Sequence, residues 1–568
     1  MIQLPIGYDN FRKIVENKLD FVDKSLFIKE IIDNKATEVT VITRPRRFGK
    51  TLNLSMLHHY LAKETYGEST EGLFDGLKIM RTGEQYLQHY RKYPVIFITF
   101  KDVKDHDYET TYAALGKLMS HVYSQHHYLL SSEKLMPYQK ENFESILREK
   151  VTKASIQSSL FDLTNLLYLH HGVKPWLLID EYDSPIQSSY VHGYYEQMIS
   201  LMRNLFGSAL KTNPYLYKAV ITGILRVAKE SLFSGLNNLE VYSLLRSEYS
   251  QYFGFTEEEM DALLVKSELN KQSVEIKSWY NGYQIGDSVV YNPWSVANCI
   301  KRKGELIPYW VNTSDNQLVR NLIVRSSMVF KDQFELLLKD KSVECPIDEN
   351  TVFGDLEKNE SAVWSLLLMA GYLKVTSQYR TEQGLQCTLA IPNQEVRSLY
   401  RQIVEQWLSS GHGIDWYNRF LDHLLTGNLE RFEYAMKEIM EQTVSSHDVA
   451  HQPEAFYHGL MLGLTASLHT NPNYEIKSNR ESGYGRYDYM IFSHDPNKPT
   501  ILLEFKRADA IQDPQALEIN LIKTAKEAIE QINQLGYVAE AKQRGCTNIL
   551  KIGLAFCGKR FKIEHEYL

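Results

Sequence analysis

A short β-branched run that leads through a basic loop into a helical pattern is the feature that most constrains the fold of this chain. Residues 38–42 (EVTVI) have the composition of a buried strand, and the later LNLSMLHHYLA has that of a helix. The intervening loop, TRPRRFGKT, ends in Arg47, Phe48, Gly49, Lys50 and Thr51. A loop in this context surrounds an anion with backbone N–H groups and a helix N-terminus, which is typical of a phosphate-binding loop.

This loop predicts a nucleotide site. We expect Lys50 to reach the β- and γ-phosphates of ATP and the Thr51 hydroxyl to ligate Mg2+. The phosphate-loop pattern GxxxxGK[ST] has glycine at its first position, where this chain has Arg44. Because Gly49 remains where the backbone approaches the phosphates most closely, we expect binding with an altered start of the loop.

An apolar run that ends in two acids supplies more of this site. WLLI at 176–179 has the pattern of a strand, and Asp180 and Glu181 follow it directly. Asp180 is placed to bind the magnesium ion, and Glu181 to activate the attacking water. A buried strand that simply ends at solvent in two acids is the alternative for this motif alone, but the two motifs in this order favour a nucleotide site.

Two further apolar runs, at 93–100 and 216–222, alternate with helical segments such as 108–128. Strands of this kind separated by helices predict a parallel sheet covered on both faces. Thr222 ends the last strand, where such sheets place ligand contacts, and is a candidate to sense the γ-phosphate. Arg226 follows it, and either stabilises charge on the nucleotide or forms a structural salt bridge.

The length of 568 residues is too great for one core, and the pattern changes twice along the chain. Residues 1–255 carry the nucleotide motifs, 256–395 form a largely helical middle region, and 396–568 begin with helices and end in strands. Three regions are therefore expected.

Within the middle region, WYNGYQIGDSVVYNPWS interrupts the helical pattern, and Gly282 and Gly286 bracket an expected hairpin or turn. An amphipathic helix at 360–372 leads into expected strands at 373–377 and 385–391. A helix followed by a two-stranded wing is the pattern of a winged helix, and equally that of an ordinary α+β connector.

The last region carries a second cluster of acids. Asp488 lies on an expected strand at 486–492, and Glu504 and Lys506 lie on the next, at 500–506. Further strands at 474–478 and 549–556 and a helix at 514–536 are expected around them. Residues two apart on a strand point to the same side, so Glu504 and Lys506 project together, and Asp488 joins them if the strands pair. Two carboxylates beside a lysine form a Mg2+ site, with Mn2+ as the alternative cation.

This cluster predicts cleavage of a phosphodiester. The metal would polarise the phosphate, and Lys506 would orient or deprotonate the attacking water. Glu454, on an upstream helix, is a candidate third metal-binding acid, and Gln531 is a candidate to steady the lysine or the metal-bound water. An exposed Glu/Lys pair on an amphipathic strand is the alternative, but the ordered set of all these groups favours a site.

Composition limits the classes of function. The net charge of −7 excludes a polycation, so any nucleic acid would have to be bound by a local basic patch. The five cysteines are scattered, without a CxxC or Cys/His cluster, which supports neither a disulfide framework nor a structural zinc site. The first residues lack a secretory signal and the apolar runs are only strand-sized, so we expect a cytoplasmic protein without a membrane span.

Several segments carry a resemblance to known proteins: LPIGYDNFRKI, TRPRRFGKT, LLIDEYDSPI, ITGILRVAKESLFSGLNNL, WYNGYQIG with VYNPWS, YW with TS, IPNQEVRSLY, YHGLMLGL, GYGRYDYMI and LLEFK. In combination they resemble the bacterial AAA-ATPase-like proteins that have a C-terminal PD-(D/E)XK nuclease domain. The resemblance extends over nearly the whole chain. Such families usually have arginine at the position of Arg44, so the altered loop is similar to theirs.

The resemblance implies an α/β fold with an AAA-like P-loop ATPase domain built on a parallel sheet, a helical and winged-helix-like middle, and a restriction-endonuclease-like α/β domain. It also implies roles in defence against foreign DNA or in mobile-element biology. It implies ATP binding by Lys50, Thr51, Asp180 and Glu181, and magnesium binding by Asp488 and Glu504.

Two classes of function follow from these motifs. In the first, ATP binding or hydrolysis gates an enzyme that cuts nucleic acid, with DNA favoured over RNA. In the second, the phosphate loop is the switch of a signalling or interaction protein, and the nuclease-like fold is an idle scaffold. The complete Asp/Glu-x-Lys set favours the first. A processive motor is disfavoured because no second helicase-like lobe or ring-forming signal is evident, and assembly into homo-oligomers stays open.

Overall fold

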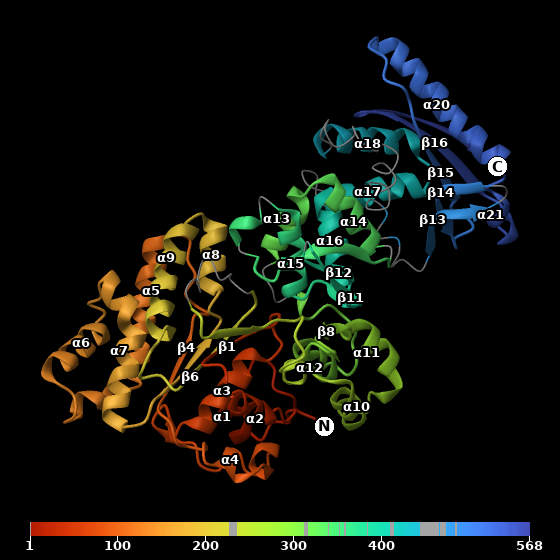
Figure 1. Cartoon of the computed structure of the whole chain (residues 1–568). Helices are drawn as coiled ribbons and strands as arrows, with labels where there is room; N and C mark the ends of the chain where they lie inside the picture. The colour runs from red at the N-terminus through yellow and green to blue at the C-terminus, as the bar shows by residue number, and fades with distance from the viewer. Residues whose placement is uncertain are drawn as a thin grey trace. The chain divides into compact units, whose positions relative to one another are not determined.

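The computed structural model describes residues 2–568 apart from the segments 226–235, 312–315, 339, 352, 357–358, 383, 409–413, 444–464, 466–467, 469–472 and 483–484. The chain forms two compact units, and Figure 1 colours it from the N-terminus to the C-terminus. Unit 1 comprises Met1–Leu322 and Asp340–Val396, and unit 2 comprises Ile323–Lys339 and Arg397–Leu568.

Unit 1 is built on a five-stranded sheet in the order β4-β5-β6-β1-β7, in which every neighbouring pair is parallel. Its strands are β1 (Val39–Thr43), β4 (Val95–Thr99), β5 (Trp176–Asp180), β6 (Lys218–Gly223) and β7 (Leu239–Tyr242). β1, β5 and β6 are buried over their whole length, as expected where helices cover both faces of a parallel sheet. The predicted parallel α/β arrangement is confirmed.

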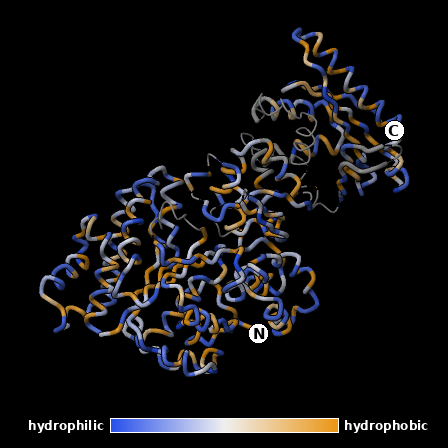
Figure 2. The backbone as a smooth tube through the Cα atoms, viewed as in Figure 1, coloured by the Kyte–Doolittle hydropathy of each residue, from blue (hydrophilic) through white to orange (hydrophobic). Residues whose placement is uncertain are grey.

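The helices associated with this sheet are α1 (Phe11–Glu16), α2 (Leu26–Asp33), α3 (Lys50–Leu61), α4 (Glu84–Leu87), α5 (Tyr108–Ser124), α6 (Pro137–Leu147), α7 (Lys153–His171), α8 (Ser184–His192) and α9 (Tyr195–Leu210). α3 packs against β4, β5 and β6, while α7 and α9 pack against each other. Hydrophobic positions gather along the strands between these helices (Figure 2). The helix predicted at 108–128 ends at Ser124, and a 3-10 turn follows at His127–Ser131.

The strand order decides which sequence motifs meet. β6 lies between β1 and β5, so the loop that follows β1 and the acids that end β5 are not on adjacent strands. Thr222 of β6 pairs in register with Ile42 of β1, and it lies between the two motifs. Because parallel strands have their carboxyl ends at one edge, all three motifs share that edge.

In the described part of the chain, the short pair β2 (Glu64–Thr65) and β3 (Glu68–Ser69) was not predicted from the sequence, and neither were three edge strands of the larger sheets. They are β7 of the parallel sheet, β10 (Val343–Ile347) of a three-stranded sheet and β17 (Arg560–Tyr567) of the C-terminal sheet. β10 alternates between buried and exposed residues, and β17 is mostly polar or charged. An edge strand needs little apolar sequence, which leaves a weak signal.

The middle of the chain contains the predicted hairpin, formed by β8 (Tyr283–Ile285) and β9 (Ser288–Val290). Gly286 has φ +51°, and a Cβ built on it would lie 2.4 Å from the Cα of Ser247, so only glycine fits this turn. The helices along this part of the chain are α10 (Glu257–Lys266), α11 (Ser273–Tyr280), α12 (Pro293–Lys301), α13 (Gln317–Arg325) and α14 (Met328–Leu338).

The expected helix with a two-stranded wing is also present. α15 (Glu360–Met369) leads into the antiparallel pair β11 (Lys374–Thr381) and β12 (Gly384–Ala390). β10 pairs with the other side of β12 and completes a sheet in the order β10-β12-β11.

Glu395 lies in the first turn of α16 (Gln394–Leu408) and is fully buried. Its carboxylate accepts hydrogen bonds from Ser295 Oγ (2.8 Å) and from the backbone N–H of Trp310 (2.6 Å). Burial raises the pKa of Glu395 to about 7. This acid therefore joins α12 and the segment around Trp310 to the start of α16.

Unit 2 contains a second five-stranded sheet, in the order β13-β14-β15-β16-β17. β15 and β16 are parallel, and the other neighbours are antiparallel. The new elements are α17 (Ile414–Leu425), α18 (Leu429–Thr443), β13 (Tyr474–Ser482), β14 (Gly485–Ser493), β15 (Thr500–Arg507), α20 (Pro514–Gln534), α21 (Ala539–Gln543) and β16 (Ile549–Cys557). This mixed sheet is consistent with the expected nuclease-like α/β domain. Among the helices that the structure describes, none is long and apolar enough to cross a membrane.

α20 lies against β15, β16 and β17 and packs closely on the sheet at Gly553. A Cβ built on this glycine would lie 2.2 Å from the carbonyl oxygen of Ala525 and 3.1 Å from the Cβ of Ala528. Gly553 pairs in register with Glu504, so the close approach brings α20 next to the acid cluster.

Substituting Gly553 by alanine should destabilise unit 2. The added methyl group would force α20 away from the sheet, and overpacking of this kind costs about 1–3 kcal/mol. Urea-induced unfolding followed by circular dichroism should show a lower midpoint. Gly207→Ala in α9 is the matched control, because its new Cβ would meet no heavy atom within 4 Å. Equal midpoints for Gly553→Ala and the wild type would contradict this close packing.

The free energy of unfolding should depend on the protonation of Glu395. Its pKa of about 7 in the folded protein lies above its ordinary value of 4.5, so the folded state binds the proton more tightly than the unfolded state. The stabilisation is complete below pH 4.5 and is lost as the pH rises towards 7. The loss amounts to about 3 kcal/mol, because each unit of pKa difference corresponds to about 1.4 kcal/mol. Urea unfolding at a series of pH values should show that the free energy of unfolding falls less with rising pH in Glu395→Gln than in the wild type. An equal fall in both proteins would mean that other groups cause the pH dependence.

Candidate functional site

The loop between β1 and α3 has the geometry of an anion cradle. Arg47 (φ +67°) and Gly49 (φ +83°) adopt left-handed backbone conformations, which turn the chain sharply into the helix. Among the described residues, no carbonyl accepts a hydrogen bond from the backbone N–H groups of Gly49, Lys50 and Thr51. A Cβ built on Gly49 would meet no heavy atom within 4 Å. Open space beside amide donors at a helix N-terminus fits a phosphate group.

Arg44 anchors the start of this loop. Its guanidinium is buried, and burial lowers its pKa to about 9. It donates hydrogen bonds of 2.8 to 3.1 Å to the carbonyls of Thr43, Tyr242, Ser243 and Glu248. Arg44, which replaces the glycine of the usual loop pattern, therefore connects the end of β1 to the segment that follows β7.

Lys50 lies across the loop that precedes it. Its ammonium group donates to the carbonyls of Arg44 (3.0 Å) and Pro45 (2.8 Å). Burial lowers the pKa of Lys50, and the negative charges of Glu181 and Asp180 oppose that shift. A phosphate would be a stronger partner for this ammonium than neutral carbonyls are, because charge-assisted hydrogen bonds are the stronger ones.

Asp180 is the point at which three elements meet. Thr51 of α3 donates to its Oδ2 (2.7 Å), and Thr222 of β6 donates to its Oδ1 (2.6 Å). The carboxylate is fully buried, and burial raises its pKa. The structure thus brings the three predicted side chains together. A hydroxyl and a carboxylate in contact are hard oxygen donors suited to Mg2+, with phosphate oxygens to complete its coordination.

The turn after Asp180 carries two more acids. Glu181 has φ +50°, and its Oε2 accepts from Ser184 Oγ (3.3 Å). Asp183 was not predicted as a site residue; it is buried, and its Oδ2 accepts from the backbone N–H groups of Ile224 (2.9 Å) and Leu225 (3.0 Å). Asp183 therefore ties this turn to the end of β6. Its sequence signal is a third acid close behind the Asp-Glu pair.

The predicted nucleotide-binding residues Arg47 and Phe48 contribute their backbone to the loop, but their side chains contact the middle of the chain. The Arg47 guanidinium lies over the ring of Trp294, 4.3 Å from its centroid. Phe48 is buried and meets the ring of Tyr283 edge to face at 5.0 Å. Arg226, also predicted here, lies outside the described residues.

The acid cluster of unit 2 lies where two strands separate. β14 and β15 pair in register from Ile491 and Ile501 to Tyr489 and Leu503. Beyond that point side chains replace the backbone ladder, because the N–H of Asp488 donates to Glu504 Oε2 (3.3 Å) and that of Phe505 donates to Asp488 Oδ2 (2.9 Å). The two carboxylates therefore occupy the fork between the strands.

Glu504 is buried, and Gln531 of α20 donates to its Oε1. Burial raises the pKa of Glu504 to about 8, and the negative charge of Asp488 adds to the shift, while Lys506 opposes it. The partly exposed Lys506 lies two residues further along the same strand, on the side of the sheet that Glu504 faces. The same Gln531 amide nitrogen lies 3.4 Å from the hydroxyl of Tyr537, a buried residue that was not predicted.

The two carboxylates fit a divalent cation. Both are hard oxygen donors, and the burial that raises the pKa of Glu504 disfavours its charged form, a cost that a bound cation would offset. Within the described residues, no group of three or more His, Cys, Asp or Glu side chains could hold a metal ion. Glu454, the predicted third acid, lies outside those residues. The described residues would thus supply two ligands, Asp488 and Glu504, and water and phosphate oxygens would take further positions.

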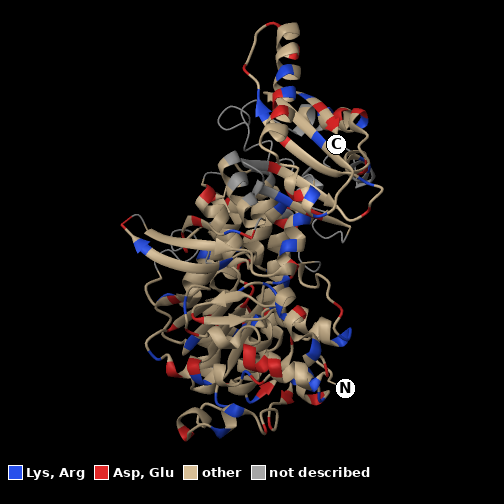
Figure 3. Ribbon diagram, turned by 90° about the vertical axis from the view of Figure 1, so that its right-hand side faces the viewer, with Lys and Arg blue, Asp and Glu red and all other residues tan. Residues whose placement is uncertain are grey.

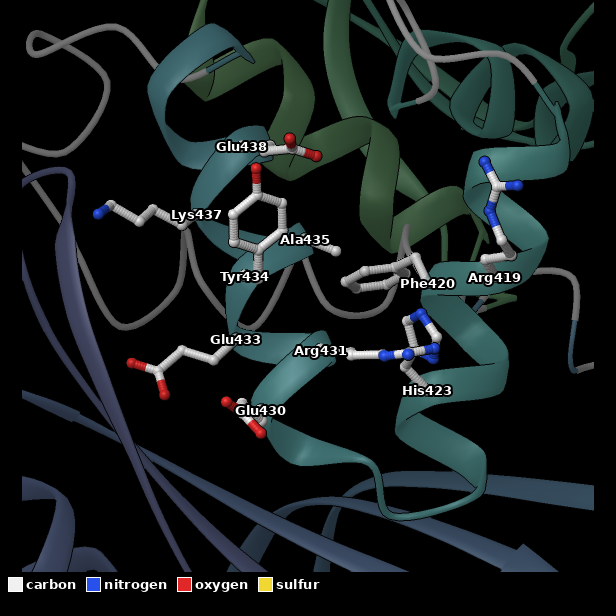
Figure 4. A pocket seen from close by; sticks show the side chains of 10 residues that line it. All are labelled: Arg419, Phe420, His423, Glu430, Arg431, Glu433, Tyr434, Ala435, Lys437 and Glu438. Carbon is white, nitrogen blue, oxygen red and sulfur yellow. The ribbon is translucent and has the colours of Figure 1, made fainter.

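A separate hollow of about 800 Å³ lies between α17 and α18 (Figure 4). Arg419, Phe420 and His423 line it from α17, and Arg431 and Tyr434 line it from α18. Glutamates 430, 433 and 438 also contribute to its wall, so positive and negative charges nearly balance. No residue of the acid cluster lines this hollow, and its mixed charge does not favour an anion.

Two family models match the chain. Residues 5–233 match the family described as Predicted AAA-ATPase, and residues 452–566 match the PD-(D/E)XK nuclease superfamily. A protein of Azotobacter chroococcum mcd 1, named "Uncharacterized protein in vnfD 5'region", is 24% identical over 546 residues, which is 96% of this chain and 94% of that protein.

These matches define the class of protein as one that joins an ATPase-like domain to a nuclease-like domain. The N-terminal part of the chain is an AAA-ATPase-like domain, and the C-terminal part is a domain of the PD-(D/E)XK nuclease superfamily, as the resemblance of the sequence motifs implied.

Divalent cations should stabilise unit 2. Mg2+ or Mn2+ held by Asp488 and Glu504 would offset their mutual repulsion, and a ligand at a hundred times its Kd adds about 2.7 kcal/mol. Differential scanning calorimetry with and without the cation should show a higher transition temperature. Glu504→Gln should lose this shift, whereas Asp180→Asn, which changes only the other acid site, should keep it. A wild-type transition that does not respond to either cation would count against the metal site.

Proposed function

We propose that the protein binds and hydrolyses ATP and, under the control of ATP, cleaves DNA through a metal-dependent nuclease site. The observation that carries the proposal is the grouping of Asp488, Glu504 and Lys506 at a strand fork, in a chain that also has a phosphate-binding loop. The family matches support the two-domain architecture. The substrate, the cations, the domain boundaries and the role of each residue belong to the proposal.

In the nucleotide site, each predicted residue has a role that its chemistry supports. Lys50 would bind the β- and γ-phosphates, and Thr51 and Asp180 would hold the Mg2+ that accompanies them. Glu181 would accept a proton from the water that attacks the γ-phosphate. Thr222 donates to Asp180. Loss of the γ-phosphate would change the surroundings of Asp180, and this hydrogen bond would pass the change to β6.

In the nuclease site, a divalent cation bound by Asp488 and Glu504 would polarise the scissile phosphate and lower the pKa of a water molecule. Lys506 would orient that water and offset negative charge that develops on the phosphate. Gln531 holds the Glu504 carboxylate in place, and Tyr537 contacts the same amide. Glu454 remains the candidate third acid.

Binding of nucleic acid would depend on local contacts. Lys and Arg are interspersed with Asp and Glu over the ribbon (Figure 3), and the net charge is −7. Arg507, Lys559 and Arg560 are exposed at the end of β15 and β16 that carries Lys506. Cations at this position would contact phosphates on either side of the one being cleaved.

A cytoplasmic location and a role in defence or mobile-element biology are further parts of the proposal. Cleavage of DNA under ATP control needs both ATP and Mg2+, and the cytoplasm supplies them. Association into homo-oligomers would place several nuclease sites on one DNA molecule.

The proposal is tested by incubating the purified protein with plasmid, linear duplex and single-stranded DNA, with and without ATP and with Mg2+ or Mn2+. We expect cleavage that requires the cation and responds to ATP. Lys506→Ala should reduce cleavage by roughly a hundredfold or more, because it removes the group that orients the water, and should leave ATP binding unchanged. Lys523→Ala, an exposed lysine of α20, is the matched control and should cleave as the wild type does.

Two outcomes would contradict the proposal. Cleavage that persists in Lys506→Ala preparations would point to a contaminating nuclease. ATP binding without cation binding or cleavage by the wild type would favour a nucleotide-switched signalling or interaction protein whose nuclease-like domain is a scaffold. Lys50→Ala distinguishes the nucleotide site from the nuclease site. This variant should lose ATP binding and should keep the binding of a divalent cation at Asp488 and Glu504.

A further inference from the structure

Two aromatic residues from the middle of the chain contact the side chains of the phosphate-binding loop. Trp294 stacks against the Arg47 guanidinium at 4.3 Å, and Tyr283 meets Phe48 at 5.0 Å. Both belong to the segment WYNGYQIGDSVVYNPWS, for which the nucleotide and nuclease chemistry gives no role. All these residues lie in unit 1.

A third contact reaches the same loop. Gly371 has φ +86°, and a Cβ built on it would lie 2.9 Å from the Cβ and Cγ of Pro45. Pro45, Arg47 and Phe48 are thus each packed against a residue that lies far away in the sequence. The loop is therefore contacted by the middle of the chain at three of its residues.

The residues that hold the loop are themselves fixed. The Tyr283 ring meets Trp310 edge to face at 6.1 Å. Asn292 accepts from the backbone N–H groups of Trp294 (2.9 Å) and Ser295 (3.2 Å), which fixes the first turn of α12. Ser295 donates in turn to the buried Glu395. Trp294 and Tyr283 therefore present their rings to the loop from a rigid support.

The backbone of the loop needs such support. Arg47 is not glycine and yet has φ +67°, a conformation that L residues rarely adopt without outside contacts. Stacking of its guanidinium on Trp294 and burial of Phe48 against Tyr283 oppose relaxation of this turn. The N–H groups of Gly49, Lys50 and Thr51 follow directly, so their direction depends on that turn.

We propose that Trp294 and Tyr283 are positioning residues of the nucleotide site. They hold Arg47 and Phe48 so that the amides of the loop converge on the phosphates, and through them the middle region sets the affinity for ATP. The inference rests on the ATP-binding part of the proposed function and not on the nuclease part. By linkage, bound ATP strengthens the packing of the middle region on the loop to the same extent.

The test is the affinity of the full-length protein for ATP and Mg2+, measured by isothermal titration calorimetry. Trp294→Leu keeps an apolar side chain but removes the ring face, and it should weaken ATP binding roughly threefold, the range expected for loss of a cation–π contact to the exposed guanidinium of Arg47. Trp294→Phe retains a ring and should recover most of the affinity. Trp279→Leu, in the same segment but packed in the helical cluster of α10–α12, is the matched control and should bind ATP as the wild type does.

A double-mutant cycle separates positioning from general stability. If Trp294 acts through Arg47, Arg47→Leu combined with Trp294→Leu should weaken binding no more than either substitution alone. Melting temperatures should stay close to that of the wild type for both single variants. Tyr283→Leu gives an independent measure through Phe48, with circular dichroism to establish that it is folded.

Each outcome decides the inference. Wild-type ATP affinity in folded Trp294→Leu and Tyr283→Leu, or effects of Arg47→Leu and Trp294→Leu that simply add, would overturn it while leaving the proposed function intact. Absence of ATP binding by the wild-type protein would overturn both. Weakened binding by Trp294→Leu with recovery in Trp294→Phe supports the positioning role, whatever the DNA cleavage assay shows.

Discussion

A carboxylate removed from water costs free energy unless hydrogen bonds or a cation compensate it, and each candidate site is organised around one such group. Asp180 is fully buried at the end of β5, and Glu504 is buried on β15. The donors that satisfy them come from other elements: Thr51 and Thr222 for Asp180, and the Asp488 backbone with Gln531 for Glu504. These hydrogen bonds form only if α3 and β6 lie next to the end of β5, and if β14 and α20 lie next to Glu504 on β15.

The two acids have different surroundings, which suit different tasks. Both oxygens of Asp180 accept from hydroxyl groups, so a cation there would share its place with Thr51 and with the phosphates of a nucleotide. Glu504 accepts from amide groups and stands next to a second carboxylate, and its pKa is raised to about 8. A cation bound there would polarise a phosphodiester and a water molecule, as the proposed hydrolysis requires.

Sequence patterns located most of the fold because its central strands are continuous apolar runs. β5 begins at Trp176 as predicted and includes one residue more, Asp180, while β15 extends only one residue beyond the predicted strand. The edge strands β7, β10 and β17 escaped prediction because each lacks a continuous apolar run, whereas the edge strand β4 has one and was predicted. The side-chain directions of Arg47 and Phe48 escaped it as well, because their stacking partners lie more than two hundred residues further along the chain.

By itself, the sequence determined the α/β class, the loop at the entry to α3 and the set of acids and the lysine from which the metal site is proposed. These depend on local periodicity and on residue types at short spacing. Only the tertiary structure decided that β6 lies between β1 and β5, that Arg44 anchors the loop, that Asp183 and Tyr537 lie beside the candidate sites, and that Trp294 and Tyr283 contact the loop. The physical reason is that strand order, hydrogen bonds to buried acids and aromatic stacking join residues remote in sequence, and no local pattern records which remote partner a residue will meet.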